Sequence, residues 1–174
     1  METSTHTVFA QFNDTIDQWI AYLNDYTLEQ LCRQPEPGSW SIGQVYVHII
    51  DDTSYFVEQI ATALLSTANS DKEMHKNAKF IFGNKGFPDM QIQGPATNTP
   101  IRQPQTKEEL RQGLTAIKAK VNQLSTSFDF SQSNGKTEHP ALWFFSATEW
   151  LQFAEMHMRH HIRQKKRIDN QLAF

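Results

Sequence analysis

The sequence predicts an all-α protein built as a four-helix bundle. Apolar residues recur at helical spacing in separate segments, and Ser/Thr-x-x-Glu/Gln capping signals precede three of these segments. No stretch alternates apolar and polar residues in the way that is typical of a half-buried strand. Metal and cofactor sites in such bundles form between side chains on facing helices. Polar residues on the inner helix faces are therefore the candidates for chemistry.

Length and composition are those of one ordinary domain, which we expect to span residues 1–174. The formal net charge is -3, so the chain offers no overall attraction to nucleic acid. A single cysteine, Cys32, excludes an intramolecular disulfide. The N-terminal residues lack the basic and apolar regions of a secretory signal, which predicts a cytoplasmic protein. No apolar run reaches the roughly 20 residues that a membrane-spanning helix needs, so no membrane role is expected.

Two helices are expected in the first half of the chain. An apolar stripe at helical spacing predicts the first from about Ser4 to Asp25, and a turn follows at Thr27 to Leu31. Ser41-Ile-Gly-Gln44 has the form of a capping box, which predicts the start of the second helix. This helix continues to Leu64, and a shorter helical piece is expected to end at about Phe82.

A long loop is expected from Gly83 to Gln105, because four prolines interrupt that segment. Loops of this length are uncommon in compact domains unless they are functional, so the segment is either a lid over a site or a plain crossover. Thr106-Lys-Glu-Glu109 predicts the start of the third helix, which carries apolar residues through Leu124. Ser127 to Phe145 is expected to be irregular, and Ser146-Ala-Thr-Glu149 begins the fourth helix.

Two histidines of the fourth helix, His157 and His161, are the strongest candidates for chemistry. Residues four apart project from one helix face, offset by about 40° and about 6 Å along the axis, so both imidazoles could bind one ion. They continue the inward stripe begun by Trp150 and Ala154, where an imidazole without a partner is costly. His48, on the second helix, is the candidate third ligand. Three neutral nitrogen ligands would leave coordination positions open, as catalytic metal sites do.

Each of these histidines also has a purely structural interpretation. His157 and His161 lie in a helix rich in Arg and Lys, so they could be polar groups on a charged face. His48 could be a buried histidine that bonds a neighbouring carbonyl. The position of all three on inward stripes favours the metal site over these alternatives.

Other polar residues near the candidate ligands are expected at the edge of the site. Asp52 follows His48 by four residues and is a candidate outer partner or proton relay, whereas Asp51 is expected to face solvent. His160 points about 100° away from His161, so it is not expected to share the ion. His160 is therefore a peripheral candidate for proton relay.

The remaining histidines and basic residues have simpler explanations. His6 and His75 are expected to be solvated, and His139, which precedes Pro140, is expected to anchor the loop that enters the fourth helix. The basic run at 159–167 complements the negative C-terminal end of a helix dipole and covers a solvent face. Nucleic-acid binding is not expected, because it would need a broader basic surface.

Several short motifs together resemble a known family. They are Trp40-Ser-Ile-Gly-Gln-Val-Tyr-Val-His48, His139-Pro140, Glu149-Trp150 and His157-x-x-His160-His161-x-x-Gln164, in that order. In order and spacing they resemble the DinB/YfiT-like superfamily, nearest its metal-dependent hydrolase branch. The resemblance covers nearly the whole chain, including the number and order of the helices.

This resemblance implies a fold, a cofactor and a class of activity. It implies an up-down-down-up bundle, often a homodimer, in which His48, His157 and His161 hold a divalent ion such as nickel, zinc or iron. His160 matches a frequent motif position but is not a ligand in that family. The implied function is a metal-dependent enzyme acting on a small molecule, as a hydrolase or as an S-transferase that uses a low-molecular-weight thiol. The alternative is a non-enzymatic dimeric bundle whose metal or ligand site is vestigial or stabilising.

Overall fold

Four long helices dominate the computed structural model, which describes residues 4–88 and 101–173. The elements, in chain order, are α1 (Thr5–Tyr22), the short 3-10 helix η1 (Leu23–Asp25), α2 (Leu28–Cys32), α3 (Ile42–Leu64), α4 (Lys76–Gly83), α5 (Lys107–Ser127), β1 (Lys136–His139), β2 (Trp143–Ser146) and α6 (Ala147–Leu172). The prediction of a four-helix bundle is confirmed by α1, α3, α5 and α6. None of the helices in the described ranges is both long and apolar enough to cross a membrane.

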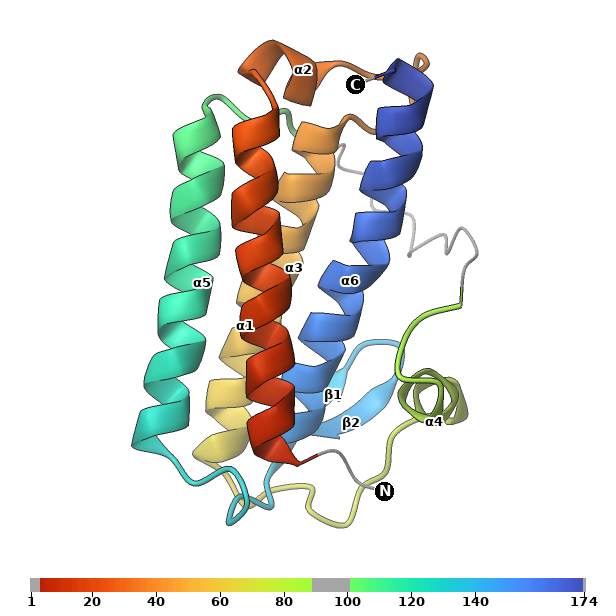
Figure 1. Ribbon diagram of the computed structural model, residues 1–174. Coiled ribbons are helices and arrows are strands. Elements are labelled where there is room, and N and C mark those ends of the chain that lie inside the picture. The colour runs from red at the N-terminus through yellow and green to blue at the C-terminus, as the bar shows by residue number, and fades with distance from the viewer. Residues whose placement is uncertain (1–3, 89–100, 174) are drawn as a thin grey trace.

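The four long helices run up-down-down-up, as the family resemblance implied (Figure 1). Helices α1 and α6 run in one direction, and α3 and α5 run in the other. Both α6 and α5 pack against α1 and against α3. Because α3 and α5 run in the same direction, the chain has to return along the bundle between them, and α4 begins that return.

Side-chain caps begin two of the long helices where the sequence predicted them. The Ser41 hydroxyl accepts a hydrogen bond from the Gln44 backbone N–H, and the Gln44 side chain accepts the Ser41 backbone N–H. Ser146 and Glu149 form the same reciprocal pair at the start of α6. Each box satisfies two backbone donors that have no partner inside the helix, so the first residue of α3 and of α6 is sharply defined.

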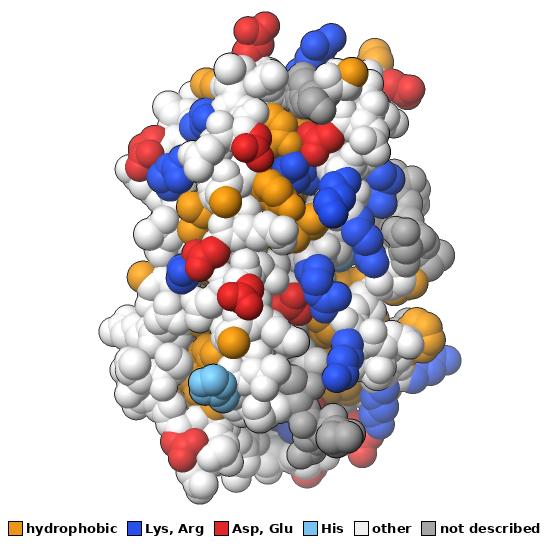
Figure 2. All heavy atoms as spheres, viewed as in Figure 1, with side chains coloured by type: hydrophobic (Ala, Val, Ile, Leu, Met, Phe, Trp, Pro, Cys, Tyr) orange, Lys and Arg blue, Asp and Glu red, His pale blue; other side chains and the backbone are white. Residues whose placement is uncertain are grey.

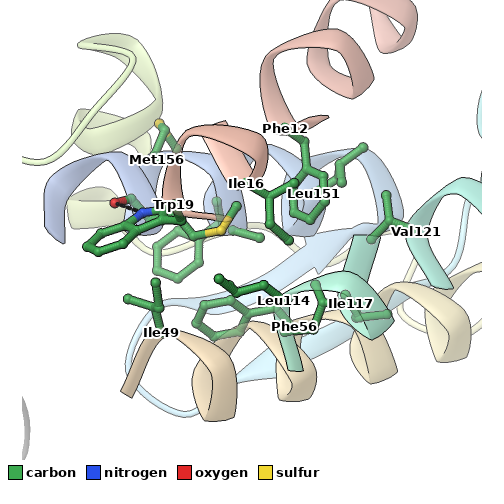
Figure 3. Close-up of a cluster of buried hydrophobic side chains, with 14 of the residues drawn as sticks. Phe12, Ile16, Trp19, Ile49, Phe56, Leu114, Ile117, Val121, Leu151 and Met156 are labelled. Atoms are coloured by element: carbon green, nitrogen blue, oxygen red, sulfur yellow. Dashed lines mark hydrogen bonds between the residues drawn. The ribbon is translucent and has the colours of Figure 1, made fainter. Parts of the chain in front are cut away.

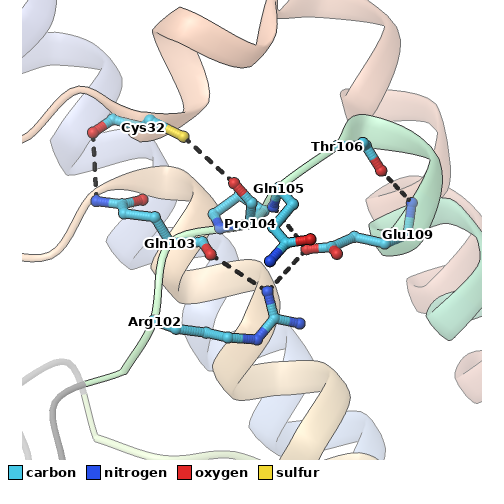
Figure 4. A network of polar contacts seen from close by, with 7 residues as sticks. All are labelled: Cys32, Arg102, Gln103, Pro104, Gln105, Thr106 and Glu109. Carbon is cyan, nitrogen blue, oxygen red and sulfur yellow. Dashed lines mark hydrogen bonds and ion pairs between the residues drawn. The ribbon is translucent and has the colours of Figure 1, made fainter.

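The third predicted capping box is only half formed (Figure 4). Thr106 accepts the Glu109 backbone N–H at 3.1 Å and so caps α5. The Glu109 carboxylate does not return to Thr106. It accepts the Gln105 backbone N–H at 2.9 Å and pairs with Arg102 at 2.9 Å. The carboxylate thereby ties the segment before α5 to the helix.

Two segments differ from the sequence predictions. The predicted turn Thr27–Leu31 is the short helix α2, because Thr27 and Gln30 form a further capping box. The predicted irregular region contains the antiparallel hairpin β1–β2, in which His139 pairs with Trp143. Each strand has four residues, which is too short to display an alternating pattern. The hairpin is held by packing of β1 against α3 and of β2 against α6.

One histidine prediction was wrong. His75 was expected to be solvated, yet it is half-buried and its Nδ1 accepts the Asn77 backbone N–H at 3.2 Å, which caps α4. Its ring also packs edge-on against Trp143, with centroids 4.8 Å apart. His6, in contrast, is exposed as expected.

The core fills the space between the long helices with large side chains (Figure 3). Trp19, Tyr46 and Trp150 are fully buried. The Trp19 indole N–H donates to the Met158 carbonyl at 3.1 Å, and the Tyr46 hydroxyl donates to the Trp19 carbonyl at 2.8 Å. Burying one apolar side chain such as Phe12 stabilises a fold by about 1.5–3 kcal/mol. This packing makes α3 and α6 a rigid frame for the side chains between them.

The two ends of the predicted loop from Gly83 to Gln105 are tied to the bundle. At one end, Arg159 of α6 donates to the Lys85 carbonyl at 2.7 Å. At the other, the Gln103 side chain donates to the Cys32 carbonyl at 3.3 Å (Figure 4). The central residues 89–100 of this segment, for which the sequence left both a lid and a plain crossover open, lie outside the described part of the chain.

The basic run at 159–167 is not a uniform solvent face. Figure 2 shows Lys and Arg side chains gathered along the α6 side of the molecule, and Lys166 and Arg167 are exposed. Lys165, however, is 5% exposed, and its ammonium lies 2.8 Å from Asp169 and 4.1 Å from the centre of the Tyr22 ring. The carboxylate and the aromatic ring compensate its burial.

Candidate metal centre

Three histidines from two helices converge halfway along α6. His48 lies on α3, His157 and His161 lie on α6, and one nitrogen from each lies within 4.8 Å of the others. The ring centroid of His48 is 5.1 Å from that of His157 and 4.7 Å from that of His161. The structure thus brings together the three residues that the sequence nominated as metal ligands.

Helix periodicity and helix packing account for this convergence. His157 and His161 are four residues apart and extend the buried face that includes Trp150 and Ala154. Helix α3 runs antiparallel to α6 and packs against it. The cap at Ser41 sets the start of α3, which places His48 about two turns into the helix.

The cluster is buried on the α6 side and partly open on the α3 side. His157 is 9% exposed and His161 is 7% exposed. The side chain of His48 is 20% exposed, and that of Asp52, one turn further along α3, is 40% exposed. The cluster is therefore partly exposed to solvent on the α3 side.

Gln164 orients the ring of His161. The Gln164 side-chain oxygen lies 2.7 Å from Nδ1 of His161. A carbonyl oxygen can only accept, so Nδ1 carries the proton and Nε2 of the neutral ring keeps its lone pair. Nε2 lies 3.2 Å from Nε2 of His157, so that lone pair is directed into the cluster. Such a hydrogen bond fixes the tautomer of a metal-binding histidine.

All three imidazoles are held in the neutral form. Burial, with a smaller contribution from neighbouring His48, lowers the pKa of His161 to about 3. Burial also holds the pKa of His157 well below its ordinary value, with a smaller contribution from His161. The pKa of His48 is lowered by burial as well, although the Asp52 carboxylate opposes that shift. At neutral pH the cluster therefore presents nitrogen lone pairs rather than positive charges.

His157 is enclosed by aromatic side chains. The rings of Phe56, Phe153 and Phe87 lie 5.5, 6.5 and 6.2 Å from its ring, measured between centroids. Its Nδ1 is buried and has no hydrogen-bond partner within residues 4–88 and 101–173. Phe87 is placed there by Arg163 of α6, which donates to the Phe87 carbonyl at 2.9 Å.

Asp52 lies closer to the cluster than its sequence position alone could show. Its Oδ2 is 3.6 Å from Nε2 of His48 and 3.6 Å from Nε2 of His157. Burial raises the pKa of this carboxyl group, while His48 acts in the opposite direction. Asp51 is exposed, as predicted. A carboxylate thus borders the histidines at their open side.

His160 lies beside the cluster and not within it. Its ring centroid is 5.1 Å from that of His161, and its Nδ1 is 2.9 Å from the Arg163 guanidinium. Because guanidinium groups only donate, Nδ1 of His160 is an acceptor there. The ring also packs against Phe87, at 5.3 Å. This position agrees with the expectation that His160 is peripheral.

Sequence reasoning missed the aromatic residues that line the cluster. Trp40 packs against His48, with ring centroids 5.2 Å apart. Phe153 precedes His157 by four residues, so helical spacing could have found it. Phe87 follows α4 in a region without periodicity, and nothing in the sequence indicates its place.

His139 anchors the hairpin, as one interpretation of the sequence proposed. Its Nδ1 accepts the backbone N–H groups of Ala141 and Leu142 at 3.1 and 3.2 Å. Its ring packs against Trp150 and Phe153, with centroids 5.5 and 5.2 Å away. It is separated from the three clustered histidines by that aromatic layer and adds no ligand to them.

The clustered residues fit a divalent cation. Two nitrogens bound to one ion at about 2.1 Å lie about 3.0 Å apart in octahedral geometry and about 3.4 Å apart in tetrahedral geometry. The separation of 3.2 Å between Nε2 of His157 and Nε2 of His161 falls in that range. Neutral imidazoles beside a carboxylate are donors that suit zinc, nickel and iron better than calcium or magnesium.

A family model and solved structures match this chain. The model described as the DinB superfamily matches residues 7–164, a range that includes the three histidines. No curated protein sequence gives a significant match.

Two solved structures share the architecture. TT2238, described as a four-helix bundle protein, aligns with a TM-score of 0.62 and 13% identity over 94% of this chain and 99% of that one. YfiT from Bacillus subtilis, described as a probable metal-dependent hydrolase with an unusual four-helix bundle topology, aligns with a TM-score of 0.64 and 14% identity over 99% of this chain and 91% of that one. At these identities the likeness establishes the fold.

Proposed function

The chain belongs to the DinB superfamily, and on that premise we propose that it is a metal-dependent hydrolase acting on a small molecule. His48, His157 and His161 would hold one divalent cation, which is zinc, nickel or iron. The observation that carries the proposal is the convergence of three imidazole nitrogens within 4.8 Å of one another. The shared fold of YfiT, described as a probable metal-dependent hydrolase, supports the same class of reaction.

The arrangement of donors suits catalysis better than a purely structural metal site. Three protein nitrogens leave coordination positions open, whereas structural zinc sites are closed by four protein ligands. A divalent cation, when bound, lowers the pKa of a water molecule in such an open position. The partial exposure of His48, 20%, supports access of water and substrate to this side.

The surrounding residues have distinct roles in the proposed reaction. Asp52 would accept a proton at Oδ2 from the entering water as the water oxygen bonds to the electrophilic atom of the substrate. It would then pass that proton to the leaving group as the bond between the leaving group and the electrophilic atom breaks. Gln164 keeps the Nε2 lone pair of His161 directed inward. Trp40 forms an aromatic wall beside His48, and Phe87 covers His157 and excludes water from its buried side.

Metal content tests the first part of the proposal. We expect protein purified without an affinity tag, and then loaded with zinc, to retain about one ion per chain by elemental analysis. A triple variant with His48→Ala, His157→Ala and His161→Ala is expected to lose the ion while it keeps its helical circular dichroism. A folded triple variant that still holds one ion per chain would contradict the assignment.

Product chemistry tests the second part. The loaded protein is incubated with carboxylic esters, amides and phosphate esters in ¹⁸O-water, with and without a chelator. Hydrolysis predicts ¹⁸O in the product and a rate that the chelator abolishes. A product formed only when a low-molecular-weight thiol is added, and carrying its sulfur, would instead assign an S-transferase. A protein that binds the ion but converts no substrate of either kind would favour the non-enzymatic bundle.

A further inference from the structure

A cavity lies away from the histidine cluster, between the β hairpin and the segment that leads into α4. Its volume is about 400 Å³, and it is lined by Glu73, Met74, His75, Lys76, Lys79 and Trp143. None of these residues belongs to the candidate metal centre. Any ligand of this cavity would therefore bind independently of the candidate metal centre.

The backbone at Trp143 has an unfavourable conformation. Its φ is +66°, in the left-handed region. His139 pairs with Trp143, so three residues connect the strands, and hairpins of this kind place a left-handed residue after the turn. Glycine or asparagine normally occupies such a position, because in other residues the Cβ atom lies too close to the following carbonyl oxygen, whereas glycine has no Cβ and asparagine gains a local hydrogen bond. Glycine or asparagine at position 143 would therefore leave the hairpin backbone less strained than tryptophan does.

The core does not require this tryptophan either. Trp143 is 52% exposed, whereas Phe145, two residues later on the same strand, is completely buried. The indole makes one aromatic contact, edge-on to His75 with centroids 4.8 Å apart, within the described residues. A left-handed backbone at a large, half-exposed aromatic residue is an outlier that motivates a functional hypothesis for this position.

The charges around the indole favour an anion. The cavity lining contains two lysines and one glutamate, so its ammonium groups outnumber its carboxylates by one. Glu73 pairs with Lys79. Lys76 is exposed and makes no ion pair with any residue that the structure describes. Figure 2 shows Lys and Arg side chains gathered around the α4 end of the molecule.

We propose that this cavity binds a small planar aromatic anion. The aromatic ring of the ligand packs against the indole of Trp143, and its carboxylate, sulfonate or phosphate group pairs with Lys76. Aromatic packing supplies buried area and orientation, and the ammonium group supplies selectivity for the negative charge. The site is independent of the proposed metal-dependent reaction, since no residue is shared.

Fluorine NMR on protein labelled with 5-fluorotryptophan tests the proposal. The four tryptophans, Trp19, Trp40, Trp143 and Trp150, give separate resonances, and Trp143→Phe assigns the one of interest. We expect 2-naphthoate to shift the Trp143 resonance saturably. The neutral probe 2-naphthalenemethanol should bind about fivefold more weakly, since a charge-assisted contact contributes roughly a factor of this size.

Variants separate binding from folding. Lys76→Gln is expected to weaken 2-naphthoate binding about fivefold, whereas Lys120→Gln, a matched change on α5, should leave it unchanged. Trp143→Gly should abolish binding, measured by naphthoate fluorescence, without lowering Tm, because glycine accepts the left-handed backbone. The proposal is overturned by equal affinity for the neutral probe, by a shift at Trp40 in place of Trp143, or by no saturable shift at millimolar probe.

Discussion

His139 and the clustered histidines occupy similar environments but meet different partners. Burial lowers the pKa of His139 to about 4 and that of His161 to about 3, so both are neutral at pH 7. Nδ1 of His139 is satisfied by two backbone N–H groups. The inner nitrogens of His157 and His161 instead face each other at 3.2 Å, with a carboxylate nearby. Burial and a low pKa therefore do not identify a metal ligand; the partners of the ring nitrogens do.

The largest expected effect is the loss of metal binding on removal of a clustered histidine. We expect His157→Ala to weaken zinc binding by more than about 100-fold, since removing a ligand exceeds the 10–100-fold typical of an outer partner. His139→Ala, the matched change, should lower Tm but leave zinc affinity within about threefold. Competition with a fluorescent chelator measures both affinities. If His139→Ala weakened zinc binding as strongly as His157→Ala, the distinction between the two environments would fail.

The carboxylate beside the cluster gives the next effect. We expect Asp52→Asn to lower the rate of hydrolysis about 100-fold, because an amide cannot accept the proton from water. Zinc affinity should fall by no more than the 10–100-fold that is typical of an outer partner. Asp51→Asn, on the exposed face of α3, is the control and should leave the rate unchanged. Rates are measured on zinc-loaded protein with the best substrate of the ester and amide panel.

A smaller effect is expected at the residue that orients His161. Gln164→Leu removes the acceptor of the Nδ1 proton, so the ring can adopt the other tautomer or rotate, and zinc affinity should fall about tenfold. Gln164→Glu supplies an acceptor at the same place and should restore the affinity. Proton-detected ¹⁵N spectra of the imidazole report the tautomer directly. An unchanged tautomer and affinity in Gln164→Leu would show that the hydrogen bond has no orienting role.

The smallest effect concerns His139 and the pH dependence of stability. Its pKa falls from the ordinary 6.5 to about 4 in the folded protein. Between these values the unfolded chain binds the proton and the native chain does not, so the free energy of unfolding falls as pH falls from 6.5 to 4. We expect His139→Asn, which keeps an acceptor but does not titrate, to remove about 1–2 kcal/mol of this loss.

Urea unfolding of the metal-free protein at several pH values measures this effect. Above pH 6.5 both states leave His139 neutral, so the variant should differ from the parent by a constant amount there. The interpretation fails if the two proteins lose stability in parallel below that pH.

Sequence patterns predicted the structure correctly where the interacting residues lie within one helix. The capping pairs Ser41–Gln44 and Ser146–Glu149 appear in the structure as predicted, because both partners lie within one helical turn. The hairpin β1–β2 was missed, since four-residue strands are stabilised by packing against α3 and α6 and not by their own pattern. His75 was misjudged for a related reason, because its partner Trp143 is distant in sequence.

The sequence by itself determined the four long helices, their inward faces and the three candidate histidines, because helix periodicity relates residues only a few positions apart. The tertiary structure alone decided which nitrogens meet. Antiparallel packing of α3 on α6 sets His48 and Asp52 against His157, and the carboxylate to imidazole distance of 3.6 Å is a property of that interface. The tertiary structure also decided that Trp143 and Lys76 line one cavity, since the hairpin and α4 come together only in the folded chain.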